Sequence, residues 1–453
     1  MNERVISHVG EDVKSGNKII PKLELTVNFK KTLLAVLPLM LVQILQRFAP
    51  IIDNHYIANL GTEALLIHNI QYSFINLGQY IGSATAVSCL IFWKRAEYAD
   101  KQGGIFYIHM GLCLGISLIC MLVASLYSQN ILAHFSVKPE YYSLATKYFN
   151  LGLFNMVLQA MYLALIGIVI AVNKERLSLL FSIVLLLLNI AADSLIIHLF
   201  FSGEISPQNI TSSMLAIIIS NITLITISIG IIFYFLRNKI KQVNFGNYKE
   251  ILKIWTNELG GAFISAAYPI VYLFQLGLVK TDGSLLVTYQ LLMQLTAVFC
   301  IPILATMQVA LREASAQQGV SRSSYIPLWV RELSYFGFIP TEIFLLLFMM
   351  YPVLFIQLVF GYLTPADHIS YIVIYLFASM IGQIGNMLTV AIRARKKSHL
   401  VTTGYFISDV IVLVGGTQLL FIAHIATPMT TGLVMLLYTC VYTLINAYFV
   451  FRK

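Results

Sequence analysis

The sequence predicts an all-α membrane protein with twelve transmembrane helices in two pseudo-symmetric six-helix lobes. Three observations lead to this prediction. Of the 453 residues, 58% are hydrophobic and only 11% are charged, whereas about 25% are charged in a soluble protein. Apolar segments long enough to cross a bilayer recur along the whole chain. Positive charges gather in alternate loops, which is typical of a membrane protein with a fixed orientation.

A window of about 20 apolar residues, the length that crosses a bilayer, defines the expected helices. They cover residues 33–59, 66–92, 105–127, 143–171, 178–201, 213–236, 251–279, 284–310, 326–351, 369–392, 399–424 and 429–450. The first 30 residues are polar and lack an apolar core followed by a small-residue cleavage site. We therefore expect no removable signal peptide, and the first helix is expected to act as an uncleaved insertion signal.

Lysine and arginine residues predict the orientation through the positive-inside rule. With the N-terminus inside, the cytoplasmic loops contain most of them, including basic runs at 94–95, 237–253 and 393–397. The outer loops contain only three lysines, which are Lys138, Lys147 and Lys280. We therefore expect both termini to be cytoplasmic and the protein to span the inner (plasma) membrane of the cell.

The two halves of the chain share a loop pattern that predicts an internal repeat. KRAEYADKQG follows the second expected helix and LREASAQQG follows the eighth, and the two segments share Glu, Gln and Gly at one fixed offset. The predicted domains are a cytoplasmic tail (1–30), an N-lobe (31–236), a linker (237–250) and a C-lobe (251–453). Parallel repeats of this kind occur in transporters, with the substrate site between the halves.

Two aspartates lie inside apolar segments of the N-lobe, where a charge is costly to bury and marks a candidate functional site. Asp53 lies in LPLMLVQILQRFAPIIDNHYIANLG, and Asp193 lies in LLLLNIAADSLII. Asn189 precedes Asp193 by one helical turn, so the two side chains share a helix face. Together these oxygen-bearing groups form a candidate site for a proton or a hard cation. The alternative is that they are polar contacts between helices.

Four further polar residues of the N-lobe are candidates for substrate contact or for tuning that site. Gln46 lies on the same helix face as Asp53, and Arg47 precedes Asp53 by six positions. Arg47 fits either a structural ion pair or a contact to an anionic substrate. Asn155 and Gln159 share a face of the fourth helix, and they either line the lobe interior or hold helices together.

The C-lobe carries three acids inside apolar segments. Glu342 and Asp409 are candidate substrate contacts, and Glu258 is expected to pair or to extend toward the membrane surface. The five cysteines and nine histidines show no metal-ligand spacing, so we expect no metal site. The sequence contains no P-loop, no Rossmann glycine pattern and no HExxH motif, so we expect neither an enzyme nor direct coupling to ATP.

Several segments resemble the multidrug and toxic compound extrusion (MATE) family. PLMLVQILQRFAPIIDNHYIANLGTEAL resembles the first helix of that family, in which a proline is followed by an aspartate and a glycine-containing loop; Pro38, Asp53 and Gly61 fit. LLLLNIAAD resembles the fifth helix with its N-x-x-x-D pattern, and residues 289–319 resemble the eighth helix and the loop after it. The resemblance covers essentially the whole chain and agrees with two six-helix lobes.

This resemblance implies a cation-coupled antiporter that exports organic, amphipathic small molecules by alternating access. It implies the DinF-like branch, with coupling at Asp53, Asn189 and Asp193, because the glutamate position of the seventh helix falls near Ile270 and the tenth helix has no carboxylate. A threonine of the sixth helix aligns with Ile217. This favours a proton over sodium, because sodium needs several oxygen ligands and a proton needs one base.

A second hypothesis is a lipid-linked oligosaccharide flippase of the same superfamily. It predicts cations along the central cleft to hold a diphosphate, whereas only Arg47 lies within a helix and the other basic residues lie near the membrane surfaces. The expected partners are an organic small molecule and the lipid bilayer, without nucleic acid. We expect a monomer with no cofactor except the coupling ion, H⁺ or Na⁺.

Overall fold

The computed structural model describes residues 33–45, 62–93, 98, 100–134, 139–200, 210–240, 248–277, 279, 284–316, 334–360 and 363–452. For some helical residues, among them Asp193, only the backbone is described. Within these ranges every regular element is a helix, and each of the twelve expected spans contains a described helix. Seven described helices are long and apolar enough to cross a membrane, or nine if each of two bent pairs is one span. The predicted all-α membrane fold is therefore confirmed.

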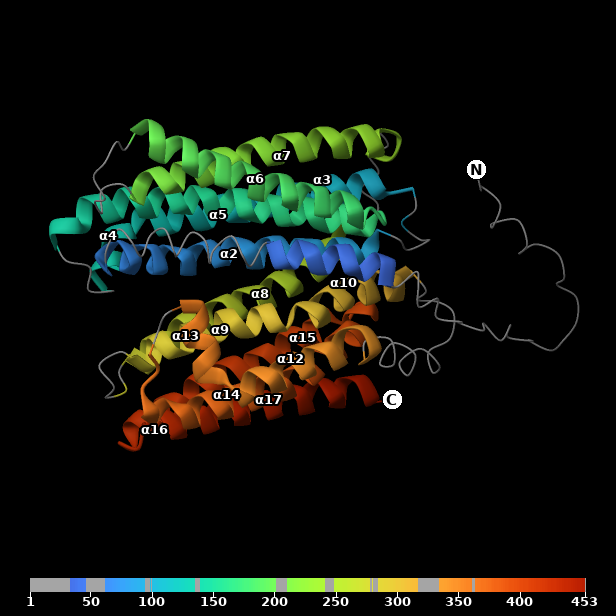
Figure 1. Ribbon diagram of the computed structural model, residues 1–453. Helices are drawn as coiled ribbons and strands as arrows, with labels where there is room; N and C mark the ends of the chain where they lie inside the picture. Colours follow the sequence, from blue (N-terminus) through green and yellow to red (C-terminus); the bar gives the residue numbers. More distant parts are fainter. Residues whose placement is uncertain are drawn as a thin grey trace, which may run out of the picture.

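The helices form two groups (Figure 1). The first group contains the helix Leu33–Leu45, α2 (Thr62–Phe92), α3 (Gln102–Leu126), α4 (Ser128–His134), α5 (Tyr142–Ala171), α6 (Glu175–Phe200) and α7 (Ile210–Ile240). The second contains α8 (Tyr248–Gly277), α9 (Ser284–Phe299), α10 (Ile301–Ala316), η4 (Ser334–Phe338), α12 (Ile339–Met350), α13 (Pro352–Phe360), α14 (Ile369–Ala394), α15 (Ser398–Tyr405), η6 (Phe406–Gly415), α16 (Gly416–Ile422) and α17 (Pro428–Phe451). Short 3₁₀ turns η2 (Pro139–Tyr141) and η5 (Ala366–His368) precede α5 and α14. The domain boundaries given above stay a prediction.

Two of the predicted spans are bent, which the hydropathy pattern did not predict. α9 and α10 meet at an angle of 54°, and Pro302 stands at the start of α10. The span that begins in η4 turns by 90° between α12 and α13, where Pro352 begins the new helix. Proline lacks the backbone N–H that would continue the hydrogen-bond ladder, so it starts helices readily and interrupts them. A hydropathy window measures apolar length and does not detect such a bend.

Glycines allow α2 and α5 to pack closely. Gly78 and Gly82 lie four residues apart in α2, and a Cβ at either position would collide with the backbone of Met156 or Ala160 in α5. On the α5 side, a Cβ at Gly167 would collide with Ala86. Small residues spaced by four bring helix backbones together in membranes, where dispersion contacts replace the hydrophobic effect. We call this contact the glycine seam.

Among the described residues, the two lobes share a buried core at one end of the bundle. One apolar cluster joins the ends of α2 and α5 to α8, α10 and α14. Toward the other end, each lobe has its own cluster, which is built around Tyr148 and Phe149 in the N-lobe and around Tyr272 and Tyr371 in the C-lobe. The C-terminus and the basic turn after α14 meet at one end of the bundle, where Arg395 donates to the Val450 carbonyl over 3.2 Å. The shared core lies at this end.

Polar contacts join the lobes at this same end, which we call the basic end. Buried Arg312 of α10 donates to the Ile170 carbonyl over 3.0 Å and pairs with Glu175 at the start of α6. Trp255 of α8 donates its indole N–H to Thr85 of α2 over 3.1 Å. The protein is therefore closed between the lobes at the basic end. That this end is cytoplasmic stays a prediction from the positive-inside rule.

Candidate functional site

A cavity of about 220 Å³ lies in the N-lobe. Most of its wall comes from α2, α5, α6 and α7. The helix Leu33–Leu45 adds Val42, Gln43 and Leu45, and Gln308 of α10 reaches the cavity from the C-lobe. Pockets for drug-sized ligands measure about 300–1,000 Å³, so this cavity suits ions and water rather than a whole organic substrate.

Asn189 lines this cavity from α6. It is 9% exposed, and its Oδ1 has no hydrogen-bond partner among the described residues. Asp193 follows one turn later in the same helix, as the i to i+4 spacing predicts, although its side chain is not described. The sequence-based placement of Asn189 inside the lobe thus agrees with the structure, whereas its role as a ligand stays a prediction.

Asn155 and Gln159 also line the cavity, one turn apart on α5. Both contact Asn221 of α7: its Nδ2 donates to Asn155 Oδ1 over 2.8 Å, and Gln159 Nε2 donates to Asn221 Oδ1 over 3.4 Å. Asn155 and Gln159 therefore line the interior of the lobe and also connect its helices, so the two interpretations of these amides are compatible. Sequence reasoning missed Asn221, although a lone amide in an apolar helix was an available signal.

His68 was also missed by the sequence reasoning. It lines the cavity from α2, is only 3% exposed, and its Nδ1 lies 2.6 Å from the Tyr148 hydroxyl of α5. Its other ring nitrogen, Nε2, is buried with no hydrogen-bond partner among the described residues. The partner is 80 positions away in sequence, so local spacing gave no signal for this pair.

Ile217 of α7 lines the cavity as well and is 8% exposed. This is the residue that aligns with the threonine associated with the coupling site of the family. The side chain at this point of the wall therefore contributes no oxygen ligand.

Three of the predicted site residues, Gln46, Arg47 and Asp53, lie outside the described residues. The described helix that precedes them in the chain, Leu33–Leu45, ends against the cavity at Leu45. Their expected roles as coupling, tuning or substrate groups stay predictions.

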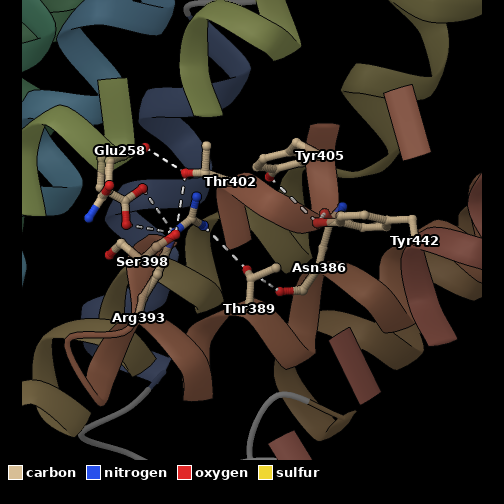
Figure 2. Close-up of polar contacts among 9 residues, drawn as sticks. Glu258, Asn386, Thr389, Arg393, Ser398, Thr402, Tyr405 and Tyr442 are labelled. Atoms are coloured by element: carbon tan, nitrogen blue, oxygen red, sulfur yellow. Dashed lines mark hydrogen bonds and ion pairs between the residues drawn. The ribbon is translucent and has the colours of Figure 1, made fainter. Parts of the chain in front are cut away.

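The C-lobe contains a chain of polar contacts near the basic end, and Figure 2 shows its course. Buried Glu258 of α8 pairs with Arg393 of α14, whose Nε lies 3.1 Å from Glu258 Oε2. Arg393 also donates to the Thr389 hydroxyl over 3.3 Å, and Thr389 donates to the Asn386 carbonyl over 2.8 Å. Tyr442 of α17 donates to Asn386 Oδ1 over 3.0 Å. The expectation that Glu258 pairs is therefore confirmed.

Asp409 and Glu342 lie apart from the N-lobe cavity. Asp409 is completely buried in η6, where Ser408 donates to its Oδ1 over 3.2 Å. The Asp409 Oδ2 atom and the Glu342 Oε1 atom have no hydrogen-bond partner among the described residues. Tyr268 and Tyr438 are titratable neighbours of Asp409. The structure thus brings neither acid to the proposed coupling residues.

The described residues contain no group of three or more His, Cys, Asp or Glu side chains that would hold a metal ion. All five cysteines are free thiols and are buried or half-buried. The polar lining of the cavity therefore comes from amides, hydroxyls and one imidazole.

Comparisons with known proteins agree with this architecture. The MatE family model matches residues 38–195. No curated protein matches the sequence at a significant level. Among solved structures, the MATE transporter VcmN of Vibrio cholerae is similar with a TM-score of 0.75 and 16% identity, over 94% of this chain and 97% of that one.

Two further structures have the same fold. A MOP superfamily transporter from Pyrococcus furiosus gives a TM-score of 0.72 at 15% identity, covering 93% of this chain and 96% of its own. An outward-facing multidrug resistance MATE transporter gives 0.72 at 16% identity, covering 93% and 95%. The family model covers the helices that build the cavity wall up to α6, and the structures share the arrangement of both lobes. Residues 38–195 therefore match the MatE family, and the chain as a whole shares the fold of MATE transporters.

Proposed function

We propose that this transporter is a cation-coupled secondary antiporter of the DinF-like branch, located in the inner membrane, which exports organic, amphipathic small molecules by alternating access. The observation that carries the proposal is the N-lobe cavity, which Asn189 lines one turn before Asp193 with an oxygen that has no partner among the described residues. Asp53, Asn189 and Asp193 form the proposed coupling site. The cavity is smaller than a drug-sized pocket, which supports a separate place for the substrate.

The coupling ion in this proposal is a proton. Sodium binding needs several oxygen ligands, and Ile217 occupies a wall position that would otherwise supply one. A carboxylate in an apolar lobe takes up a proton readily, because burial disfavours its charged form. Uptake of the proton drives transport only if the two conformations differ in their affinity for it.

The asymmetry between the two ends of the bundle supports alternating access. The lobes share a core and buried polar contacts at the basic end, and they have separate cores toward the other end. If the basic end is cytoplasmic, the structure is the state that is closed toward the cytoplasm. Transport then requires the Arg312–Glu175 pair to separate as the lobes rock.

The C-lobe acids are proposed substrate contacts. Asp409 and Glu342 each have an unpartnered carboxylate oxygen among the described residues, and Tyr268 and Tyr438 are neighbours of Asp409. A carboxylate among aromatic rings suits an organic cation, through charge attraction and cation–π contacts. Arg47, Gln46, Asn155 and Gln159 are proposed to tune the coupling site.

A flippase for a diphosphate-linked lipid is less well supported. Such a ligand needs cationic side chains, and the described lining of the N-lobe cavity contains neither lysine nor arginine.

Transport by purified protein in proteoliposomes tests the proposal. Ethidium efflux would be driven by an imposed proton gradient or an imposed sodium gradient, in wild type, Asp53→Asn and Asp193→Asn. We expect the proton gradient to drive efflux in the wild type and each variant to lose driven efflux, because an amide cannot take up the coupling proton.

The matched control is Asp367→Asn, which changes an acid whose side chain is 65% exposed in the turn before α14 and should transport normally. Size-exclusion profiles establish that each variant is folded. Normal proton-driven efflux by folded Asp53→Asn and Asp193→Asn would contradict the proposal, and efflux driven only by sodium would contradict the choice of ion.

A further inference from the structure

His68 is a titratable side chain on the wall of the N-lobe cavity that the proposed coupling site does not use. It lies in α2, is 3% exposed, and its Nε2 is buried with no hydrogen-bond partner among the described residues. Leaving a buried polar atom without a partner costs about 1–3 kcal/mol, so such atoms call for an explanation. Here the atom belongs to a ring that lines a cavity of about 220 Å³.

The other side of the ring is held in place. Nδ1 lies 2.6 Å from the hydroxyl of Tyr148, which is completely buried in α5. The ring of Tyr72, one turn farther along α2, stacks near the imidazole with a centroid distance of 6.2 Å. A hydroxyl both donates and accepts, so Tyr148 can bond to Nδ1 whether or not Nδ1 carries a hydrogen. The ring can therefore gain or lose a proton at Nε2 without turning.

His68 is the one described lining residue whose side chain becomes charged by taking up a proton. Tyr72 and Tyr162 line the cavity too, but a phenol becomes charged only by losing a proton, and does so near pH 10. The described lining from the other elements has no charged side chain: α5, α6 and α7 add amides, hydroxyls and apolar groups, and Leu33–Leu45 and α10 add Gln43 and Gln308. Tyr148 is the titratable group from α5 that faces the ring.

We propose that His68 is a second proton acceptor of the N-lobe, which takes up a proton at Nε2 alongside the proposed carboxylate site. This inference rests on the proposed proton antiport and assigns part of it to a residue outside the acidic pattern. The proton comes from water on one side of the membrane and returns to water on the other, and Nε2 supplies the electron pair that holds it.

Protonation also offers a link to movement. The protonated ring presents a new Nε2–H donor to a cavity in which Asn189 Oδ1 is an acceptor without a partner in the described part of the chain. A rearrangement that brings donor and acceptor together is therefore more favourable in the protonated state than in the neutral state. Such a difference between states is what coupling requires.

The test measures the pH dependence of proton-driven ethidium efflux in proteoliposomes, from about pH 4 to about pH 8, a range that includes the lower pKa of a buried histidine. The variant is His68→Gln, which keeps a polar side chain and cannot titrate. We expect the pH midpoint to shift by about one unit or to disappear, and driven efflux to fall about tenfold, since one pH unit is a factor of ten in protonation. Proton release on adding ethidium to the detergent-solubilised protein should also decrease.

His109→Gln is the matched control. His109 is likewise buried in the N-lobe, but both of its ring nitrogens have partners, the Ile105 carbonyl at 2.7 Å and the Ser88 hydroxyl at 2.8 Å. It does not line the cavity. We expect it to lower thermal stability and to leave the pH midpoint unchanged, so a general effect of losing a buried histidine is separated from a coupling effect.

A wild-type pH profile and unchanged proton release in His68→Gln would overturn the proposal. If that variant does not fold, Tyr148→Phe carries the test, because it keeps the imidazole and removes only the Nδ1 partner. A shifted midpoint in Tyr148→Phe supports the role of His68, and an unchanged midpoint contradicts it. If Asp53→Asn stops driven efflux while His68→Gln transports normally, the antiporter stands and only this inference fails.

Discussion

The N-lobe cavity and the polar chain of the C-lobe differ in how their buried polar side chains are partnered. In the N-lobe, His68 Nε2 and Asn189 Oδ1 line a cavity without partners among the described residues. In the C-lobe, Glu258 and Arg393 neutralise each other, and the chain of contacts continues to Asn386 and beyond. A satisfied polar chain stabilises one arrangement of helices, whereas unpartnered groups around a cavity are available to bind something. The difference supports a binding role for the N-lobe cavity and a structural role for this chain of contacts in the C-lobe.

The largest effect on stability is expected at the ion pair of the C-lobe. Arg393→Leu leaves Glu258, which is 5% exposed, without its cation, and removing one partner of a buried pair costs about 3–5 kcal/mol. We expect a large loss of thermal stability in detergent, and the double variant Glu258→Gln/Arg393→Leu should recover much of it. Arg452→Leu, at an exposed cation–π contact with Tyr448, is the control and should change stability little.

Folded Arg393→Leu protein should keep the wild-type pH profile of transport. A shifted pH midpoint without loss of stability would mean that the C-lobe chain takes part in coupling, which contradicts a purely structural role.

For Asn189, we expect a smaller effect than at the ion pair, and we expect it on transport rather than on stability. Its Oδ1 has no partner among the described residues. A typical hydrogen bond contributes about 1 kcal/mol to stability, so Asn189→Ala should lower the free energy of unfolding by less than that. Proton-driven efflux should nevertheless fall about tenfold, corresponding to about 1.4 kcal/mol. Asn150→Ala is the control, since Asn150 accepts from Ser125 over 3.1 Å and does not line the cavity.

We expect Asn150→Ala to lower the melting temperature while efflux stays coupled. The same loss of coupling in both variants would show that any amide of these helices matters, and the assignment of Asn189 to the site would be wrong.

The smallest effect is expected at Asp409, the buried C-lobe acid whose Oδ2 lacks a partner among the described residues. As a substrate contact, Asp409→Asn should raise the KM for ethidium a few-fold, worth about 1 kcal/mol, and leave the pH midpoint unchanged. Glu342→Gln, measured in parallel, shows whether both acids contribute. A shifted midpoint in Asp409→Asn would place a coupling group in the C-lobe and remove the contrast between the lobes.

The sequence predicted the helices and the lobes well, because apolar length and loop charge are local properties that a membrane constrains strongly. It also placed Asn189, Asn155 and Gln159 inside the N-lobe, because residues one turn apart share a helix face. Asp53 and Asp193 were found by their charge alone, and their side chains lie outside what the structure describes.

Other features could not be predicted, because they depend on contacts between distant segments. The partner of His68 is 80 positions away, and Arg312, expected in a loop, is buried against Glu175, 137 positions away. The 90° turn before α13 was missed, since hydropathy does not register direction.

The glycine seam restricts movement between α2 and α5 more than movement of the other helices of the N-lobe. Because the backbones are in close contact at Gly78 and Gly82, α2 and α5 cannot slide or roll past each other without steric collision, so we expect His68 and Asn155 to keep a fixed separation when the lobe changes shape. α6 packs mainly on α7, away from the seam, and carries Asn189 on the opposite wall. Any change in the width of the cavity therefore has to come from its movable wall. We therefore expect the proposed proton site to change width from the α6 side, with His68 on the side that does not move.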